Sequence, residues 1–451
     1  MIAIKHIQNC YFIGIGGIGM SALARYMKLL GKEVSGYDKT PSAVTSALIE
    51  EGIEVSFKDA VDELPYWASD IETTLIVYTP AIPASSLILT HFFTNPFTVV
   101  KRAALLGEVS KNSLCLAVAG THGKTTTSAI LGHLLAHCNM PVTAFLGGIS
   151  ENYNSNFISK GTEITVVEAD EFDRSFLTLS PDIACITSMD ADHLDIYNNA
   201  HSLEEAFTEF ASLLEDPINL LHKKGLPLNG LTVGVEEPAD FEAQNIRIVD
   251  GAYVFDLKTP NERIAHLTFH LPGHHNLHNA ITALGMAIKA GCPTKLLPEA
   301  LASFKGVQRR FSYRIRNEHV VLIDDYAHHP TELNALYQAV SEMYPDDKKI
   351  IVFQPHLFSR TRDFSLAFAK SLGQFDEVLL LDIYPAREEP IAGVTSEWLL
   401  GLIPNHAKKL IKKSEMASEL KKSNCRIKLV AGAGDIGAKV TDITKELNDE
   451  D

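Results

Sequence analysis

The sequence of 451 residues lacks several features that would assign it to a class at once. It has no run of about eighteen apolar residues, which a membrane-crossing helix requires. Glycines at residues 14–19 interrupt the only apolar stretch near its start that resembles a secretion signal. Its six cysteines form no C-x-x-C pair, and several lie in apolar runs. We therefore expect a cytoplasmic protein with reduced, buried thiols and no membrane contact.

Positive charge is also scarce. The chain has 40 lysines and arginines against 56 aspartates and glutamates, so its formal net charge is -16 at pH 7. A nucleic-acid-binding protein needs a concentrated basic face to neutralise phosphates. We therefore expect no nucleic-acid partner, although a local basic cluster could hold a small phosphorylated ligand.

What the sequence contains repeatedly is a short apolar run rich in β-branched residues, which ends in a Gly or Asp loop and precedes a helical pattern. This order is typical of parallel sheets with helices on both faces. The length corresponds to about three domains, which we place at residues 1–108, 109–312 and 313–451. The clearest expected strands lie at residues 9–13, 74–78, 113–119, 165–167, 183–187, 320–323, 350–354, 377–382 and 426–431.

One loop between an expected strand and helix carries the sequence Gly120-Thr121-His122-Gly123-Lys124-Thr125. A strand, loop and helix in this order point backbone N–H groups and a helix N-terminus at an anion. Lys124 would add a point charge on the β- and γ-phosphates of a nucleotide, and the Thr125 hydroxyl would ligate Mg²⁺. The full P-loop spacing needs a glycine where Val118 stands, so the pattern is half met. The context nevertheless favours nucleotide binding over an accidental turn.

Acidic residues follow the next two expected strands. Glu168-Ala169-Asp170-Glu171 comes after residues 165–167, and residues 190–195, which include His193, come after residues 183–187. Magnesium on a triphosphate is usually completed by one or two carboxylates. The first cluster therefore predicts a metal site, whereas His193 fits a ligand and a solvated loop residue equally well.

Near the N-terminus, Gly14-Ile15-Gly16-Gly17-Ile18-Gly19 matches the dinucleotide pattern G-x-G-x-x-G, and a second strand ends at Asp38. Taken alone, this segment would suggest an NAD-dependent oxidoreductase. A similar loop at residues 432–437 lacks the surrounding context, so we assign it no ligand.

Three further polar groups stand out. His274, His275 and His278 are spaced like a zinc set, but no fourth ligand is near, and Asn276 among them suggests a helix start that meets a base or sugar. Residues 324–330 form a very polar loop after a strand. His356, Arg360 and Arg362 resemble a clamp for a carboxylate or phosphate. Each of the three, taken singly, fits ordinary surface polarity equally well.

Together these segments resemble the Mur ligases across essentially the whole chain. The motifs that carry the resemblance lie at residues 14–20, 120–127, 168–171, 190–195, 273–279, 309–311, 324–332, 353–362, 382–385 and 432–437. The resemblance implies a three-domain α/β architecture, with a Rossmann-like N-terminal domain for a UDP-sugar, a central P-loop ATPase domain and a Rossmann-like C-terminal domain for an amino acid. The N-terminal glycines would then face a UDP-sugar pyrophosphate in place of NAD.

The reaction implied is the ATP- and Mg²⁺-dependent joining of L-alanine to UDP-N-acetylmuramate, through an acyl phosphate, in peptidoglycan precursor synthesis. The protein would act as a monomer or homodimer. The catalytic residues implied are Lys124, His193, Arg310 and His328. ATP would contact Gly120, Thr121, His122, Gly123, Lys124, Thr125, Thr126, Asn276, Asp325 and Tyr326. The UDP-sugar would contact Gly16, Ile18, Gly19, Asp38 and Thr79. The metal would contact Thr125, Glu168 and His193, and the amino acid would contact His356 and Arg360.

Two departures from the family pattern bear on the amino acid. Many alanine-adding members have Arg directly after the histidine that corresponds to His356, and Leu357 stands here. Other branches carry a modified lysine shortly after the Asp-His pair, and residues 195–222 contain none, which favours the alanine-adding branch. The alternatives are a murein tripeptide recycling ligase of the same family, an NAD-dependent oxidoreductase and a silent nucleotide-binding regulator. We expect Lys124→Ala to lower activity by orders of magnitude and to leave the fold intact, because Lys124 sits in a loop that binds rather than packs.

Overall fold

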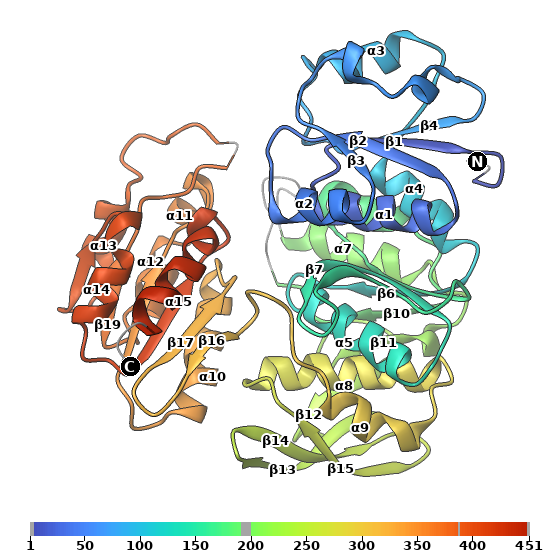
Figure 1. The fold of residues 1–451 in the computed structure, drawn as a ribbon. Coiled ribbons are helices and arrows are strands. Elements are labelled where there is room, and N and C mark those ends of the chain that lie inside the picture. Colours follow the sequence, from blue (N-terminus) through green and yellow to red (C-terminus); the bar gives the residue numbers. More distant parts are fainter. Residues whose placement is uncertain (1–3, 191–199, 387, 449–451) are drawn as a thin grey trace. The chain divides into compact units, whose positions relative to one another are not determined.

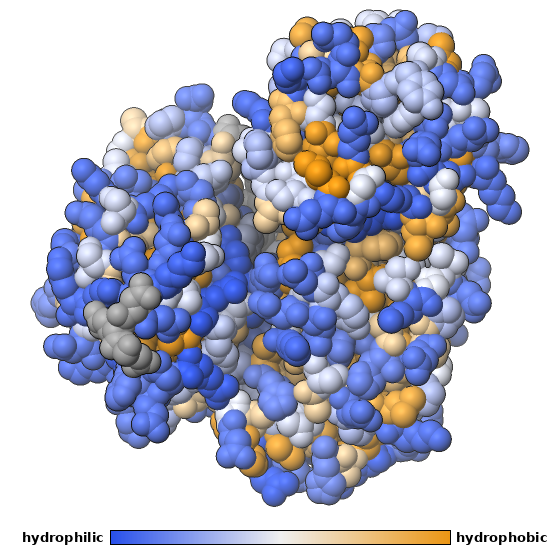
Figure 2. Space-filling view, in the orientation of Figure 1, coloured by the Kyte–Doolittle hydropathy of each residue, from blue (hydrophilic) through white to orange (hydrophobic). Residues whose placement is uncertain are grey.

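A computed structural model describes residues 4–190, 200–386 and 388–448 (Figure 1). The chain divides into two compact units. The first comprises Met1–Arg247, Val254–Phe269 and His278–Lys305, and the second comprises Ile248–Tyr253, His270–Leu277 and Gly306–Asp451. Within the described ranges, no helix is long and apolar enough to cross a membrane. Hydrophilic side chains cover most of the face seen in Figure 2, with apolar patches scattered among them.

The first sheet of the first unit has five parallel strands in the order β3-β2-β1-β4-β5. Both faces of β1 are buried, which explains its continuous apolar sequence. Cys10 and Phe12 pack with helix α1, whereas Tyr11 and Ile13 pack with α3 on the opposite face (Figure 1). The elements are β1 (Asn9–Ile13), α1 (Ile18–Leu29), β2 (Glu33–Tyr37), α2 (Ala43–Glu50), β3 (Glu54–Ser56), β4 (Thr74–Tyr78), α3 (Leu87–Thr94), β5 (Thr98–Lys101) and α4 (Arg102–Ser110).

The second sheet has ten strands in the order β15-β14-β13-β12-β11-β10-β6-β9-β7-β8. Strands β11, β10, β6, β9 and β7 run parallel, and β8 pairs antiparallel with β7. The strands are β6 (Leu114–Ala119), β7 (Val142–Ser150), β8 (Ser155–Ser159), β9 (Ile164–Glu168), β10 (Ile183–Ile186), β11 (Leu220–Lys223), β12 (Leu231–Val235), β13 (Phe241–Val249), β14 (Ala252–Lys258) and β15 (Arg263–Phe269). The α-helices are α5 (Lys124–His137), α7 (Ala200–Ala211), α8 (His274–Lys289) and α9 (Leu297–Ala302).

A buried amide joins these two sheets. The Asn156 side chain on β8 donates to the Ile18 carbonyl and to Ser21 Oγ of α1, at 2.5 and 3.0 Å. Its carbonyl oxygen accepts from Arg25 Nη1 at 2.6 Å. Helix α1 is therefore fixed against the edge of the second sheet.

The second unit contains a six-stranded sheet in the order β16-β17-β21-β18-β19-β20, in which only β16 is antiparallel to its neighbour. Side chains alternate between two helical layers, as in a doubly wound sheet. Val321 and Ile323 pack with α10, α12 and α13, and Leu322 packs with α14 and α15. The elements are β16 (Ser312–Arg316), β17 (Val321–Asp325), α10 (Pro330–Met343), β18 (Lys349–Phe353), α11 (Phe358–Asp363), α12 (Ser365–Leu372), β19 (Glu377–Leu380), α13 (Ser396–Leu402), β20 (Lys408–Leu410), α14 (Met416–Lys422), β21 (Ile427–Ala431) and α15 (Val440–Asn448).

All nine strands expected from the sequence are present, with ends that shift by one or two residues. The six cysteines lie within the described ranges and are buried without disulfide bonds, as expected. The domain boundaries that we placed after residues 108 and 312 remain predictions.

Candidate functional site

The loop at Gly120–Lys124 follows β6 and begins α5, as the sequence predicts. Gly120 and Gly123 have φ angles of +128° and +86°, which favour glycine. A Cβ atom on Gly120 would lie 2.1 Å from Thr187 Oγ1. The segment after β10 holds the loop, because Ser188 Oγ accepts from the His122 N–H at 2.8 Å and the Ser188 carbonyl accepts from the Thr121 N–H at 3.1 Å. Thr126 is buried in the first turn of α5.

Lys124 is held by Glu171, a member of the acidic cluster for which the sequence analysis predicted no contact with the lysine. Its Nζ donates to both carboxylate oxygens of Glu171, at 2.7 and 2.9 Å, and to the Gly120 carbonyl at 2.7 Å. The Glu171 side chain is fully buried. Burial opposes the charged form of Lys124, but the carboxylates of Glu171, Asp170 and Glu168 outweigh it and raise its pKa. Lys124 is therefore a fixed positive charge at the mouth of the loop.

Thr125 and Glu168 form the oxygen-rich site that was expected to hold Mg²⁺. Thr125 Oγ1 lies 2.9 and 3.0 Å from the two carboxylate oxygens of Glu168, and the Gly147 N–H donates to Glu168 Oε2 at 2.9 Å. A Cβ atom on Gly147 would lie 2.2 Å from that oxygen. Hydroxyl and carboxylate oxygens are the donors that Mg²⁺ prefers, so this pair fits the ion.

The other predicted metal ligand, His193, lies outside the described residues, so its role stays a prediction. Among the described residues, no group of three or more His, Cys, Asp or Glu side chains is placed to hold a metal. His274, His275 and His278 therefore form no zinc site. His278 is instead buried, with Nε2 3.1 Å from the Val233 carbonyl. Burial lowers its pKa to about 4.

The N-terminal glycine loop brings together the residues expected to contact a UDP-sugar. The Gly16 N–H donates to Asp38 Oδ2 at 2.8 Å, which ties the loop to the end of β2. A Cβ atom on Gly14 would lie 3.0 Å from the methyl group of Thr79. Ile18 and Gly19 begin α1. Their contacts with a ligand remain predictions.

A cavity of about 230 Å³ connects this glycine loop with Glu168. It lies within the first unit and is lined by Ile18, Gly19, Arg102, Leu106, Phe145, Leu146, Gly147, Glu168 and Asp170. The lining combines apolar side chains with one guanidinium and two carboxylates. The cavity therefore extends from the N-terminal glycine loop to Glu168, the carboxylate beside Thr125.

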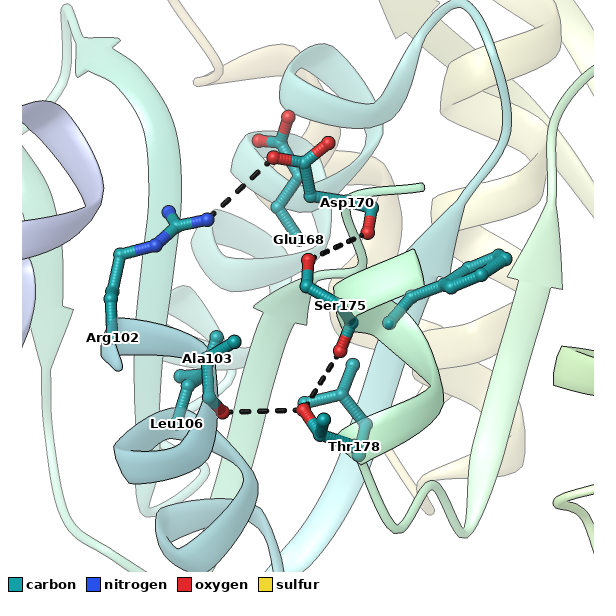
Figure 3. A pocket seen from close by; sticks show the side chains of 9 residues that line it. Arg102, Ala103, Leu106, Glu168, Asp170, Ser175 and Thr178 are labelled. Atoms are coloured by element: carbon teal, nitrogen blue, oxygen red, sulfur yellow. Dashed lines mark hydrogen bonds and ion pairs between the residues drawn. The ribbon is translucent and has the colours of Figure 1, made fainter. Parts of the chain in front are cut away.

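Arg102 is a cavity residue that the sequence analysis missed. Figure 3 shows it extending from the start of α4 toward Asp170, where the closest nitrogen and oxygen atoms are 3.6 Å apart. Glu168 lies beside Asp170 in the same view. A Cβ atom on Gly19 would lie 2.1 Å from Arg102 Nη1, so the glycine leaves room for the guanidinium. Arg102 thus brings a positive charge to the cavity beside Gly19 and Asp170.

In the second unit, the polar loop after β17 is built around Asp325. Its carboxylate accepts from the N–H groups of Phe311 and Ala327, each at 2.7 Å. Burial raises the pKa of Asp325 to about 6, although the nearby Arg310 opposes the shift. The guanidinium groups of Arg309 and Arg310 both lie over the Tyr326 ring, at 5.1 and 4.9 Å from its centroid. Asp325, Tyr326 and Arg310 are thus close together, and their contacts with ATP and phosphate stay predictions.

Two histidines, His328 and His356, follow the ends of β17 and β18 and extend the polar group around Asp325. The His328 and His356 rings lie 5.9 Å apart, and His356 stacks on Tyr384 at 5.7 Å. Arg360 Nη1 lies 3.4 Å from His356 Nδ1. Burial is the main cause that lowers the pKa of both histidines, to about 4 for His356. Both imidazoles are therefore neutral at neutral pH.

Of the three side chains expected to form a clamp, the structure brings together His356 and Arg360 but not Arg362. Arg360 is buried beside His356, but Arg362 is exposed and pairs with its neighbour Asp363 at 2.7 Å. Arg362 lies two residues after Arg360 in α11, and residues at this spacing do not share one face of a helix. Asn276 also belongs to the second unit, where its amide donates to the Pro272 carbonyl at 2.7 Å.

Three family models match consecutive parts of the chain. "Mur ligase family, catalytic domain" matches residues 9–113, and "Mur ligase middle domain" matches residues 118–287. "Mur ligase, glutamate ligase domain" matches residues 309–436.

Curated proteins and solved structures are similar along the full chain. The UDP-N-acetylmuramate–L-alanine ligase of Flavobacterium psychrophilum is 58% identical over 99% of this chain and 100% of its own length. That of Flavobacterium johnsoniae is 55% identical over 99% of each chain. The crystal structure of the UDP-N-acetylmuramate–alanine ligase of Thermotoga maritima matches with a TM-score of 0.83 and 26% identity, over 98% of this chain and 100% of that one. A murein peptide ligase of Psychrobacter arcticus, at 19% identity and a TM-score of 0.69 over 98% of each chain, shares the fold.

Proposed function

The chain belongs to the Mur ligase family, and from this premise we propose that it joins L-alanine to UDP-N-acetylmuramate, with cleavage of ATP to ADP and phosphate, in peptidoglycan precursor synthesis. The observation that carries the proposal is the cavity between Gly19 and Glu168. A UDP-sugar whose pyrophosphate meets the N-terminal loop would extend its carboxylate through this cavity toward the oxygens beside Lys124. A dinucleotide oxidoreductase has no need for such a path to a second phosphate-binding loop.

In the first step of the proposed reaction, a carboxylate oxygen of the muramate attacks the γ-phosphorus of ATP. The bond from that phosphorus to the bridging oxygen breaks, which gives an acyl phosphate and ADP. Lys124, whose raised pKa keeps it protonated, would stabilise the negative charge that develops on the transferred group. Thr125 and Glu168 would hold Mg²⁺, which neutralises charge on the β- and γ-phosphates when bound.

In the second step, the amine of alanine attacks the acyl carbon, the bond from that carbon to the phosphate oxygen breaks, and phosphate leaves. The amine gives up a proton as the amide forms. His328 would accept that proton, because its lowered pKa leaves the imidazole neutral. Arg360 and His356 would hold the alanine carboxylate, and Arg310 would contact the transferred phosphate.

Phosphate release by the purified protein tests the proposal. With UDP-N-acetylmuramate, ATP and Mg²⁺ present, we expect release to be fastest with L-alanine and slower with glycine or L-serine. Reactions without the amino acid or without the UDP-sugar provide the background. Absence of amino-acid-dependent phosphate would disprove the proposal, and tight NADH binding without ATP binding would support the oxidoreductase.

A tripeptide recycling ligase of the same family is the closest alternative. It would use L-alanyl-γ-D-glutamyl-meso-diaminopimelate in place of alanine. Adding each acceptor amine to the same reaction separates the two activities, because a recycling ligase would turn over the tripeptide faster than alanine.

A further inference from the structure

Glu388, in the loop after β19, makes hydrogen bonds to the first turn of α11. Glu388 Oε2 accepts from the Ser359 N–H at 3.0 Å, and Glu388 Oε1 accepts from the Ser359 hydroxyl. The Glu388 N–H in turn donates to the Pro385 carbonyl at 2.9 Å, which fixes the base of the glutamate. One carboxylate therefore holds both donors of a single serine, 29 residues away along the chain.

That serine directly precedes Arg360, the residue proposed to hold the alanine carboxylate. Helix α11 has only six residues. A helix this short has little stability of its own and depends on tertiary contacts for its orientation. The position of the buried Arg360 guanidinium therefore depends on what holds the first turn of α11.

The backbone that enters α11 is strained, which makes such contacts more important. Leu357 has φ +71° and ψ 136°, a conformation that non-glycine residues rarely adopt. It is held from both sides, since its N–H donates to the Tyr384 carbonyl at 2.9 Å and its carbonyl accepts from Thr361 Oγ1 at 2.7 Å. Glu388 adds a third contact at Ser359, which lies between Leu357 and Thr361 in the chain. A strained backbone conformation persists only where several contacts with the surrounding structure hold it in place.

We propose that Glu388 is a positioning residue for the amino-acid substrate, which acts by fixing the Ser359 turn so that Arg360 and His356 meet the alanine carboxylate. The inference rests on the proposed function. Glu388 would not touch the alanine. Its removal should weaken alanine binding and leave the ATP and UDP-sugar sites of the first unit unchanged.

The test compares steady-state kinetics of four variants in the phosphate-release reaction. We expect Glu388→Ala to raise the KM for L-alanine by about tenfold, because two hydrogen bonds to a charged group are lost. The KM values for ATP and UDP-N-acetylmuramate, and kcat, should change by less than about twofold. Glu388→Gln should recover part of the alanine KM, because the amide oxygen still accepts from the Ser359 N–H. The exposed neighbour Glu389 supplies the control, and Glu389→Ala should behave as wild type.

Ser359→Ala tests the same contact from the other side and keeps the inference testable if Glu388→Ala does not fold. It removes the hydroxyl donor alone, so the alanine KM should rise by a smaller factor. An unchanged KM for L-alanine in both Glu388→Ala and Ser359→Ala overturns the inference. An equal rise in all three KM values also overturns it, because it would indicate a general structural role. If the wild-type protein has no alanine-dependent activity, the proposed function itself is wrong and this inference falls with it.

Discussion

Lys124 and Glu171 form an ion pair in which each side chain depends on the other. Glu171 is fully buried, and the lysine side chain is 13% exposed. Removing one member of such a pair leaves a buried charge without its partner, which costs far more than the pair contributes when intact. The expectation that Lys124→Ala leaves the fold intact therefore needs revision, because Lys124 also neutralises a buried carboxylate.

We predict that Lys124→Ala lowers phosphate release by orders of magnitude and also destabilises the first unit. The loss of stability should be on the order of 3 kcal/mol, because Glu171 is left buried without a counter-charge. Urea unfolding at pH 7, followed by circular dichroism, measures this change.

A double variant separates the two effects of Lys124. Lys124→Met combined with Glu171→Gln replaces the charged pair by neutral side chains of similar size, so it should recover much of the lost stability while remaining inactive. If Lys124→Ala is as stable as wild type, the pair has no structural role.

The residues that sequence reasoning missed share one property: their partners are far away along the chain. Glu171 was read as one of several acids after a strand, Arg102 was not singled out, and Glu388 lies in a loop without a motif. The contact of Arg102 with Asp170 spans 68 residues. Composition and spacing carry no information about such contacts, whereas Gly120, Lys124 and Thr125 are adjacent in sequence and could be predicted as a group.

At the scale of helices and strands, the parallel register explains why the predicted site residues meet. Val118 of β6 lies opposite Glu168 of β9, so the acid at the end of one strand reaches the loop that follows the other. Parallel strands present their carboxyl ends at one edge of a sheet. This rule explains why Glu168 at the end of β9 lies beside Thr125, and the binding of Mg²⁺ by these two residues stays a prediction.

The residue at which a strand ends was harder to predict where the last residues of the strand are charged. The sequence placed the end of β17 at residue 323, but the strand continues through Asp324 and Asp325. Both pair in register with Val430 and Ala431. Asp324 is buried because Arg309 and Arg314 neutralise it, which no local pattern reveals.

Helix α4 carries Arg102 from the first sheet into the cavity, which leads to a second prediction. We expect Arg102→Ala to raise the KM for UDP-N-acetylmuramate by about tenfold, since a guanidinium in an enclosed site binds an anionic group strongly. The KM for ATP should change little. The control is Lys111→Ala at the opposite end of α4, where Lys111 pairs with Glu108 at the surface. An unchanged KM for the UDP-sugar would remove Arg102 from the binding site.

Gly147 of β7 donates its N–H to Glu168, the residue proposed to bind Mg²⁺, and a methyl group at Gly147 tests this support. Gly147→Ala would place Cβ 2.2 Å from Glu168 Oε2 and force the carboxylate to move. We predict that the Mg²⁺ concentration for half-maximal activity rises about tenfold or more, the usual cost of disturbing a residue behind a metal ligand.

Gly401→Ala in α13 is the matched control for the added methyl group, because a Cβ atom there meets nothing within 4 Å. An unaltered Mg²⁺ dependence of Gly147→Ala, at unaltered kcat, would argue against Glu168 as a metal ligand.

At the scale of the whole molecule, three buried histidines make stability depend on pH. Burial lowers the pKa of His133, His278 and His356 from 6.5 to about 4. Between these two values the unfolded chain binds more protons than the folded one, so stability falls as the pH falls. Asp325, whose pKa is raised from 3.8 to about 6, acts in the opposite direction below about pH 6. The lowered pKa of His328 acts in the same direction as these three histidines, and the raised pKa of Asp324 acts in the same direction as Asp325. The four histidines outnumber the two aspartates, so we predict a lower Tm at pH 5 than at pH 7.

Thermal unfolding at several pH values between 4 and 7 checks the sign. His133 lies 3.1 Å from both Tyr153 Oη and the Ala300 carbonyl. His133→Gln, which cannot be protonated, should therefore narrow the difference in Tm between pH 7 and pH 5. A Tm that rises on acidification would show that Asp325 dominates.

The three-domain Mur ligase architecture that the resemblance implied is confirmed by the family matches and by the Thermotoga maritima structure. Apolar periodicity was sufficient to predict α/β sheets, because it reflects burial on both faces of each strand. It did not predict the extended second sheet, in which β12 to β15 add four strands beyond β11. Their sequences mix charged and apolar residues, since part of this extension is exposed to solvent.

The burial of all six thiols makes the protein well suited to site-specific labelling. Burial raises the pKa of Cys10 and Cys115 to about 12, and reagents such as maleimides attack accessible thiolates. The native chain should therefore remain unlabelled without removal of any cysteine. Tyr66 of the first unit and Leu366 of the second are 91% and 75% exposed. Cysteines introduced at these two positions would carry a donor and an acceptor fluorophore, and energy transfer between them would follow the two units through the catalytic cycle.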